Sequence, residues 1–227
     1  LHRVDRRQRQ MCIRDSPEPQ VRRQADQLAQ LLTPIIKAFF TEQGFRQASN
    51  ALQVFGGYGY VAEFAIEQTL RDSRIAMIYE GSNEIQANDL LLRKVLGDGG
   101  QGFALLLEQL RDEAGHGAQV PECVGFARSL ADLAEALQAL VAQVQQWALE
   151  DAEYPYRAAG DFLALCGLSL LALAWARAAR VSHSLPEGDP LRGAKLETAG
   201  FFFSYLLPQV EQRMTAVRGA RAALAFI

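Results

Sequence analysis

The feature that most constrains the fold is a run of apolar residues in the second half of the chain, spaced alternately four and three positions apart. Residues at this spacing share one face of an α-helix, and a face that is apolar along its whole length must pack against neighbouring helices. The run therefore predicts one long helix within a helical bundle. Its members are Phe126, Leu130, Leu133, Leu137, Leu140, Val144 and Trp147.

Composition extends this prediction to the whole chain. Hydrophobic residues make up 49% of the 227 residues, and Ala and Leu far outnumber Val and Ile. Unbranched side chains lose less conformational freedom in a helix than branched ones, so we expect an all-α fold with almost no strand. The longest apolar run, Phe162 to Ala176, is shorter than the ~20 residues that cross a bilayer. It is interpreted as a buried central helix and not as a membrane span.

Charge and scattered ligand residues limit the function classes. The net charge of −3 provides no field that would draw the chain onto nucleic acid or an anionic membrane. The expected partners are therefore small molecules or other subunits. The cysteines and histidines lie far apart, which predicts no disulfide framework, no metal site and a reducing, cytoplasmic setting. These residues are Cys12, Cys123, Cys166, His2, His116 and His183.

The chain divides into four predicted segments. Residues 1–16 hold five Arg without an apolar period, and we expect them to be non-native or disordered. A basic tail for an acidic partner is the alternative for this segment. Residues 17–97 form a first helical part, residues 98–121 a linker or peripheral helix, and residues 122–227 a helical bundle.

The expected helices follow from periodicity and from Gly and Pro positions. In the first part we expect a helix from Glu18 to Phe39, with Pro34 as the point where it could bend, and a second helix from about Thr41. Three glycines within Gly56–Tyr60 should stop that second helix. A short helix over residues 63–72 and another over residues 85–96 follow. In the second half, a buried helix over residues 158–181 precedes a polar loop and a last helix, which Pro208 should kink or divide.

One carboxylate lies beside glycine immediately before a predicted helix. Ser82 is a plausible N-cap of that helix, and Gly81 would allow a ligand to approach closely. Glu80 could then point into a cleft as a catalytic group. Acidic residues are also favoured near helix N-termini by the helix macrodipole, and spacing alone favours that simpler interpretation. The motif reads Tyr79, Glu80, Gly81, Ser82, Asn83, Glu84, Ile85, Gln86.

Several linked motifs resemble the closing segment of the flavin-dependent acyl-CoA dehydrogenases. Their order, spacing and residue types agree with that family over about residues 31–96. The motifs are the segment from Gln53 to Tyr60, the pairs Glu67-Gln68 and Arg74-Ile75, the triplet Leu70-Arg71-Asp72, and the segment from Ile78 to Gln86.

The second half resembles the helical extension of one bacterial branch of this family, which includes enzymes similar to 3-methylmercaptopropionyl-CoA dehydrogenase. The resemblance implies an all-α chain in which the end of the dehydrogenase helical domain is followed by a helical-bundle extension. The similar residues include Asp161-Phe162-Leu163, Gly167, Ala174 to Arg177, Lys195-Leu196, Thr198-Ala199, Phe202-Phe203 and Leu206-Leu207-Pro208.

The resemblance implies FAD-dependent α,β-dehydrogenation of an acyl-CoA thioester to a trans-2-enoyl-CoA. Glu80 occupies the position of the base that removes the α-proton, while the β-hydride passes to the flavin. Burial of Glu80 beside an acyl chain would raise its pKa. An electron-transfer flavoprotein is the implied electron acceptor, and a homo-oligomer is the implied assembly.

Other site residues are also implied by the resemblance. One segment corresponds to family residues that contact FAD across a subunit boundary, and we favour this over the alternative that its glycines are a plain helix stop. That segment contains Gln53, Val54, Phe55, Gly56 and Gly57, and Ser82, Asn83 and Glu84 correspond to residues that contact the FAD of their own site. Tyr79 and Gly81 correspond to substrate-binding positions, and a packed aromatic is the alternative for Tyr79.

Three charged residues near the motif, Arg71, Asp72 and Arg74, could clamp CoA phosphates. Charges that flank a short helix are more often solvated ion pairs, and we favour that interpretation.

The family's N-terminal helical domain, its β domain and the first helices of its last domain are not found in these residues. We therefore expect a fragment that binds little or no FAD alone. An acyl-CoA oxidase and a non-catalytic helical interaction module remain alternatives.

Overall fold

The computed structural model describes residues 18–79 and 81–222, and every element in these ranges is helical. The predicted all-α fold is confirmed. The elements in chain order are α2 (Pro19–Val54), η1 (Gly56–Tyr60), η2 (Ala62–Phe64), α3 (Ile66–Arg74), η3 (Ile75–Met77), α4 (Asn83–Asn88), η4 (Asp89–Leu96), α5 (Gln101–Gly117), η5 (Pro121–Cys123), α6 (Val124–Glu150), α7 (Tyr154–Ser182), α8 (Pro190–Phe201), η6 (Phe202–Leu206) and α9 (Gln209–Gly219). Of these, η4 and η6 are π-helices, and the other η elements are 3₁₀-helices.

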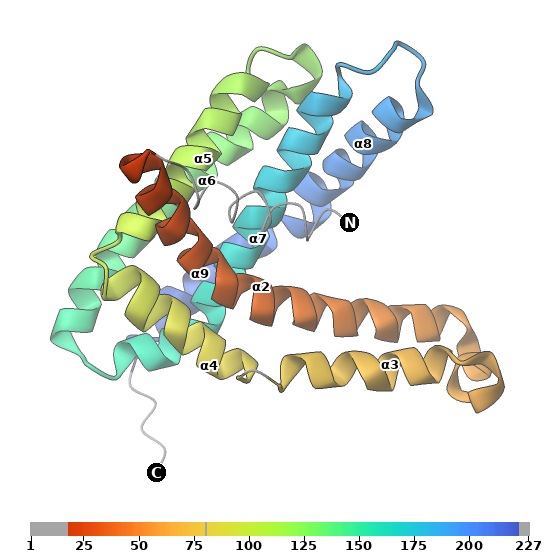
Figure 1. Ribbon diagram of the computed structural model, residues 1–227, viewed down its shortest axis with the longest axis horizontal. Coiled ribbons are helices and arrows are strands. Elements are labelled where there is room, and N and C mark those ends of the chain that lie inside the picture. Colours follow the sequence, from red (N-terminus) through yellow and green to blue (C-terminus); the bar gives the residue numbers. More distant parts are fainter. Residues whose placement is uncertain (1–17, 80, 223–227) are drawn as a thin grey trace.

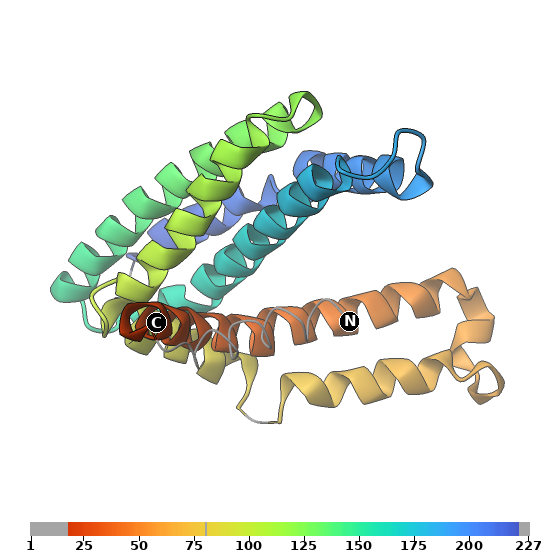
Figure 2. The same cartoon turned by 45° about the horizontal axis from the view of Figure 1, so that its top comes forward.

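The helices form a bundle from which an arm projects. The arm consists of the second half of α2 and the antiparallel α3, joined at its far end by η1 and η2 (Figures 1 and 2). Helix α2 packs with α4, η4, α5 and α7 in the bundle. Most buried residues of α2 precede Thr41, and only Ala48 is buried beyond it.

This uneven burial corrects the prediction of two helices before the glycine turn. The structure has one continuous helix, α2, from Pro19 to Val54, with Pro34 inside it. The apolar period fades after Phe39 because the helix leaves the bundle there, although the backbone remains helical. On the turn that Pro34 weakens, Thr33 Oγ1 donates a hydrogen bond to the Ala29 carbonyl at 2.7 Å. The end of the helix before Gly56 is as predicted.

Residues 98–121, predicted as a linker or peripheral helix, form a helix that is not peripheral. They contain α5, whose side chains Phe103, Leu106, Leu107 and Leu110 are buried in the main core. Glycines at both ends of the segment resemble a loop in the sequence, but the apolar residues between them follow helical spacing. The segment is therefore part of the bundle.

The central helix of the bundle is α7. It is long and apolar enough to span a membrane by length and composition, but 67% of its most apolar window is buried inside the protein. It packs against α2, α4, α5, α6, α8 and α9. These contacts give α7 the role of the predicted buried central helix.

Helix α2 packs closely on α7 at a glycine. A Cβ atom added at Gly167 of α7 would place three ring carbons of Phe39 within 2.5 Å. Phe39 is only 3% exposed, so its ring is fixed above the Gly167 backbone. Glycine is therefore required at position 167 for α2 to lie on α7.

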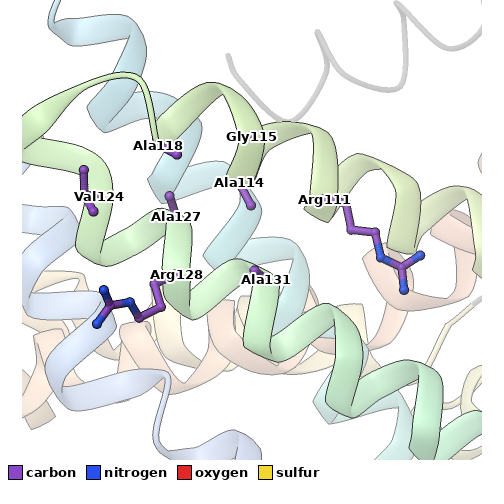
Figure 3. A pocket seen from close by; sticks show the side chains of 8 residues that line it. All are labelled: Arg111, Ala114, Gly115, Ala118, Val124, Ala127, Arg128 and Ala131. Carbon is purple, nitrogen blue, oxygen red and sulfur yellow. The ribbon is translucent and has the colours of Figure 1, made fainter.

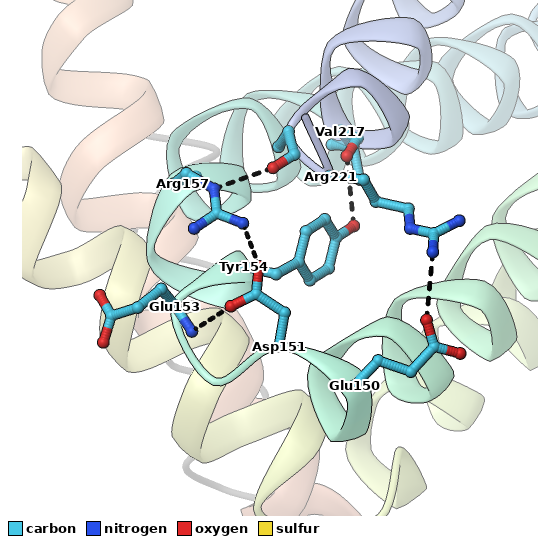
Figure 4. Close-up of polar contacts among 8 residues, drawn as sticks. Glu150, Asp151, Glu153, Tyr154, Arg157, Val217 and Arg221 are labelled. Carbon is cyan, nitrogen blue, oxygen red and sulfur yellow. Dashed lines mark hydrogen bonds and ion pairs between the residues drawn. The ribbon is translucent and has the colours of Figure 1, made fainter. Parts of the chain in front are cut away.

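The end of α9 is held against the start of α7 by side chains (Figure 4). The buried Tyr154 hydroxyl donates to the Val217 carbonyl at 3.2 Å, and Arg157 Nε donates to the Ala220 carbonyl at 2.9 Å. Arg157 also pairs with Asp151. These contacts satisfy carbonyls of the last turn and of the C-cap residue of α9, which have no partner within the helix. The predicted division at Pro208 is observed, since η6 ends and α9 begins on either side of it.

One buried ion cluster links α5 to α7. Glu113, which is 2% exposed, accepts hydrogen bonds from Arg180 Nε at 2.6 Å and from Arg177 Nε at 3.0 Å. Burial raises the pKa of Glu113, but the hydrogen bonds from both arginines outweigh burial and the net pKa is lowered.

Candidate active site

The predicted catalytic motif lies where the arm meets the bundle. Residues 78–82 connect η3 to α4, and Gly81 there has φ +95°. A Cβ atom at this position would lie 2.9 Å from Nε2 of Gln86. The left-handed backbone therefore favours glycine here, whereas the flexible end of the Gln86 side chain could move aside. Glu80, the predicted base, lies outside the described residues.

Ser82 occupies the N-cap position of α4 as predicted, but its side chain makes no capping hydrogen bond to the backbone. Its hydroxyl bonds instead to the carboxylate of Glu84. The pKa of Glu84 is lowered, first by a hydrogen bond from its own backbone N–H and then by Ser82, against a smaller opposing effect of burial; the charge of Arg74 lowers it least. Glu84 therefore remains ionised at neutral pH and holds the first turn of α4.

The neighbours of position 80 are accessible. Tyr79 is 56% exposed, and Gly81 is also exposed. Asn83 is half-buried at the first position of α4. The packed-aromatic interpretation of Tyr79 therefore has no support within the described part of the chain.

The other predicted site segment lies at the far end of the arm, which we call the tip (residues 53–64). Gln53 and Val54 end α2, and Val54 is 86% exposed. Gly56 has φ +60°, and a Cβ at Gly56 or Gly57 would meet no atom within 4 Å. The exposed Phe55 lies between α2 and η1. The tip thus presents open glycine backbone and apolar side chains to solvent.

The tip and the 78–82 loop lie at opposite ends of the arm (Figure 1). The nine residues of α3 and the three of η3 separate them by roughly 20 Å. The structure therefore does not bring Gln53–Gly57 together with Tyr79–Glu84 within one chain.

The charged residues of α3 form local pairs. Arg71 Nε lies 2.7 Å from Glu67 Oε2, and Gln68 Nε2 donates to Asp72 at 2.8 Å. Arg74 lies over the Phe45 ring at 5.9 Å. The favoured interpretation of Arg71 and Asp72 as partners within their own helix is confirmed.

A shallow groove of about 440 Å³ lies between α5 and α6 (Figure 3). Its floor is formed by small residues such as Ala114 and Ala127, and Arg111 and Arg128 lie at its edges. Arg111 bonds to Gln138. The groove contains no acid, base or nucleophile, so it is not a candidate for catalysis.

Comparison with known proteins agrees with the fold and the motif. A family model described as acyl-CoA dehydrogenase, C-terminal domain, matches residues 20–94, and one described as acetyl-CoA dehydrogenase C-terminal like matches residues 106–226. The 3-methylmercaptopropionyl-CoA dehydrogenase of Ruegeria pomeroyi is 34% identical over 196 residues, covering 83% of this chain and 33% of the relative. A broad-specificity linear acyl-CoA dehydrogenase of Mycobacterium tuberculosis is 33% identical over 51% of this chain and 20% of its own. Mitochondrial isobutyryl-CoA dehydrogenase of Bos taurus is 46% identical over 24% of this chain and 13% of its own.

The chain belongs to the acyl-CoA dehydrogenase family. The predicted resemblance to the branch with a helical extension is confirmed. The chain spans about a third of the length of its Ruegeria relative.

Two contacts of the site were missed by sequence reasoning. The Gln86 side chain covers Gly81, and the Glu84 carboxylate engages Ser82. The spacing of Gly81 and Gln86 carries no signal for such a contact, because it depends on the rotamer of Gln86. For Glu84, its place in the first turn of a helix was a signal available in the sequence.

Proposed function

We propose that this chain forms the C-terminal helical part of an FAD-dependent acyl-CoA dehydrogenase, in which Glu80 removes the α-proton of an acyl-CoA to give a trans-2-enoyl-CoA. Family membership supports the reaction class. The observation that carries the proposal is the Gly81 turn, which lies within the family motif and has the left-handed φ that only glycine adopts readily.

The two carboxylates of the motif have different roles in this proposal. Glu84 is a weak base because its pKa is lowered and its oxygens are engaged by Ser82 and its own backbone N–H. Glu80 is then the carboxylate that accepts the α-proton, and Gly81 allows the thioester to approach the backbone beside it. Bound FAD would supply the acceptor for the β-hydride. Tyr79 and Gly81 would line the acyl chain.

We infer that the tip serves the site of a second copy. The tip is about 20 Å from the 78–82 loop along α3, so it cannot close the site of its own chain. The glycine backbone fits a diphosphate, because Gly56 and Gly57 have no neighbouring atoms where a side chain would stand and amides can approach an anion directly. Gln53, Val54 and Phe55 would flank it, and Ser82, Asn83 and Glu84 would contact the FAD of their own chain. A homo-oligomer follows from this division.

The first test is Glu80→Gln in a longer protein that supplies the preceding domains. We expect flavin absorbance to be retained and exchange of the substrate α-proton with deuterated water to be lost. Glu135→Gln on the exposed side of α6, far from the motif in sequence and outside the tip, is the matched control and should leave exchange unchanged. Normal exchange in the Glu80→Gln protein would refute the assignment of the base.

Subunit mixing tests the role of the tip. Gly56→Val disrupts the tip because valine disfavours φ +60°, whereas Glu80→Gln removes the base. Each variant should be inactive alone, and mixed oligomers should recover activity because one site then combines an intact loop with an intact tip. Absence of recovery in oligomers shown to contain both variants would refute the shared site.

The electron acceptor is the last part of the proposal. We propose an electron-transfer flavoprotein as acceptor and a cytoplasmic location. Reoxidation of the substrate-reduced protein should therefore be much faster with electron-transfer flavoprotein than with dissolved oxygen. Equal or faster reoxidation by oxygen would assign the protein to the acyl-CoA oxidases instead.

A further inference from the structure

Helix α8 lies at the outside of the bundle and packs mainly on α7 (Figure 1). Ala199 is its buried residue, and Lys195 covers the Trp175 ring at 5.5 Å. The opposite side of α8, together with Ser204 and Tyr205 of η6, faces solvent.

That solvent face is apolar where a surface helix normally carries charges. Leu191 is 52% exposed, Phe201 55% and Tyr205 72%. Ala194 and Thr198 are exposed between them. Leu191, Ala194, Thr198 and Phe201 are spaced three, four and three positions apart, as residues on one α-helical face are. Tyr205 follows in the π-helix η6 and joins them through its contact with Phe201. We call these five residues the α8 stripe.

We propose that the α8 stripe docks antiparallel onto the α8 stripe of a second copy of this chain. The stripe has the self-complementary pattern that a two-fold interface requires. Leu191 and Tyr205 lie seven positions before and after Thr198, while Ala194 lies four before it and Phe201 three after it. With the two-fold axis at Thr198, Leu191 meets the second copy's Tyr205 and the small Ala194 receives the second copy's Phe201.

The aromatic end of the stripe is already ordered. Phe201 and Tyr205 stack with ring centroids 5.1 Å apart and an interplanar angle of 21°. Rings held in this way lose little freedom on binding, which favours association. Gly193 is exposed and Gly200 half-buried beside the stripe, so a second helix could approach closely.

Charge argues against an anionic surface as the occupant. The two cations on α8 already have partners: Arg192 Nη2 lies 2.8 Å from His183 Nδ1 and 3.5 Å from Glu122, and Lys195 covers Trp175. The charge on the solvent side is Glu197, which would repel acidic lipids or nucleic acid.

The area of the stripe sets the strength of the contact. From their exposed fractions, Leu191, Phe201 and Tyr205 offer on the order of 300 Å² per chain, compared with ~800 Å² per partner in a standard interface. The contact alone therefore gives a weak dimer, and detection should rely on position-specific cross-linking.

The experiment places a cysteine on the proposed two-fold axis. Cys123 and Cys166 are buried, so the full chain with Cys12→Ser provides a background for Thr198→Cys. Under mild oxidation, Thr198→Cys should form disulfide-linked dimers at least about tenfold faster than Thr215→Cys, because docking raises the local thiol concentration. Thr215 is an exposed threonine on α9 and serves as the matched control. Adding Phe201→Glu should reduce the Thr198→Cys rate to that of the control.

Sedimentation gives a second readout that distinguishes this contact from general association through the apolar tip. Phe201→Glu should weaken self-association, and Tyr156→Glu, at an aromatic 54% exposed on α7, should not. Equal cross-linking at positions 198 and 215, or equal effects of the two glutamates, would overturn the proposal. Neither readout requires FAD or turnover, so the result is independent of the proposed enzymatic function.

Discussion

Substitution of Gly167 by alanine tests how the two family-matched parts of the chain are joined. Gly167 lies in α7, within the part matched by one family model, and Phe39 lies in α2, within the part matched by the other. The added methyl group would place three Phe39 ring carbons within 2.5 Å. That is roughly 1 Å closer than carbon atoms normally approach, so the ring or the helix must move.

The expected loss of stability can be bounded from both sides. Phe39 is 3% exposed and packs edge-on against Phe40 at 5.6 Å, so expelling its ring forfeits much of its packing, which is worth about 3–5 kcal/mol for a buried Phe. Overpacking without expulsion costs about 1–3 kcal/mol. Alanine returns about 1 kcal/mol of helix propensity relative to glycine. The net loss should be about 2–4 kcal/mol, or roughly 5–15 °C in Tm for a chain of this size.

The measurement is urea and thermal unfolding followed by far-UV circular dichroism. Gly160→Ala is the matched control, because Gly160 is exposed on the same helix and a Cβ there meets no atom within 4 Å. That control should gain up to about 1 kcal/mol. Phe39→Ala combined with Gly167→Ala should cost less than the sum of the two single changes, since the cavity accepts the methyl group. A Gly167→Ala protein as stable as Gly160→Ala would refute the close packing of α2 on α7.

Three further predictions concern ligand binding, the end of α9 and acid stability. The purified chain should bind FAD at well below one equivalent, because the tip and the 78–82 loop are about 20 Å apart along α3; a stoichiometric flavin spectrum would contradict this. Tyr154→Phe should cost about 1–3 kcal/mol in urea unfolding by leaving the Val217 carbonyl without its partner, whereas Tyr156→Phe at the exposed neighbour should cost almost nothing. Glu113→Gln should cost about 1–3 kcal/mol at neutral pH, a range reduced because Arg177 is 40% exposed. The pKa of Glu113 in the folded protein lies below 4.5, so its contribution to the free energy of unfolding is present above that pH and is lost as the pH falls through the folded pKa. The urea midpoint of Glu113→Gln should therefore fall less on acidification than that of the unsubstituted chain. An equal fall would contradict this prediction.

The spacing of apolar residues was enough to predict helices that bury one face along their whole length. The four-and-three spacing from Phe126 to Trp147 corresponds to α6, where Leu130, Leu137 and Val144 are fully buried. It failed where burial changes along an element. The regular spacing of apolar residues in α2 ends after Phe39, because the helix enters the arm there. The apolar face of α5 is short and is bounded by glycines. In both cases tertiary position, and not local propensity, decides the pattern.

The sequence suggests which residues form the candidate site, but it does not show how they lie in space. The motif places Glu80, Gly81 and Ser82 in order, and the left-handed Gly81 agrees with the need for glycine. Sequence order also brings Gly56 within 24 residues of Glu80. Only the antiparallel path of α2 and α3 puts the tip and the loop at opposite ends of an arm. Distances of this kind follow from helix lengths and directions, which a motif does not contain.

The extension supports the candidate site physically. Both α4, which begins directly after the Gly81 turn, and η4, which continues it, pack on α7, as does α2. Leu90 and Leu91 of η4 are fully buried in the same core as Phe162 and Leu173 of α7. The start of α4 is therefore positioned by a helix of the extension, and loosening that helix would move the turn that presents position 80. On this reasoning Gly167→Ala, in a longer protein with FAD, should lower turnover as well as stability, although it changes no residue of the site.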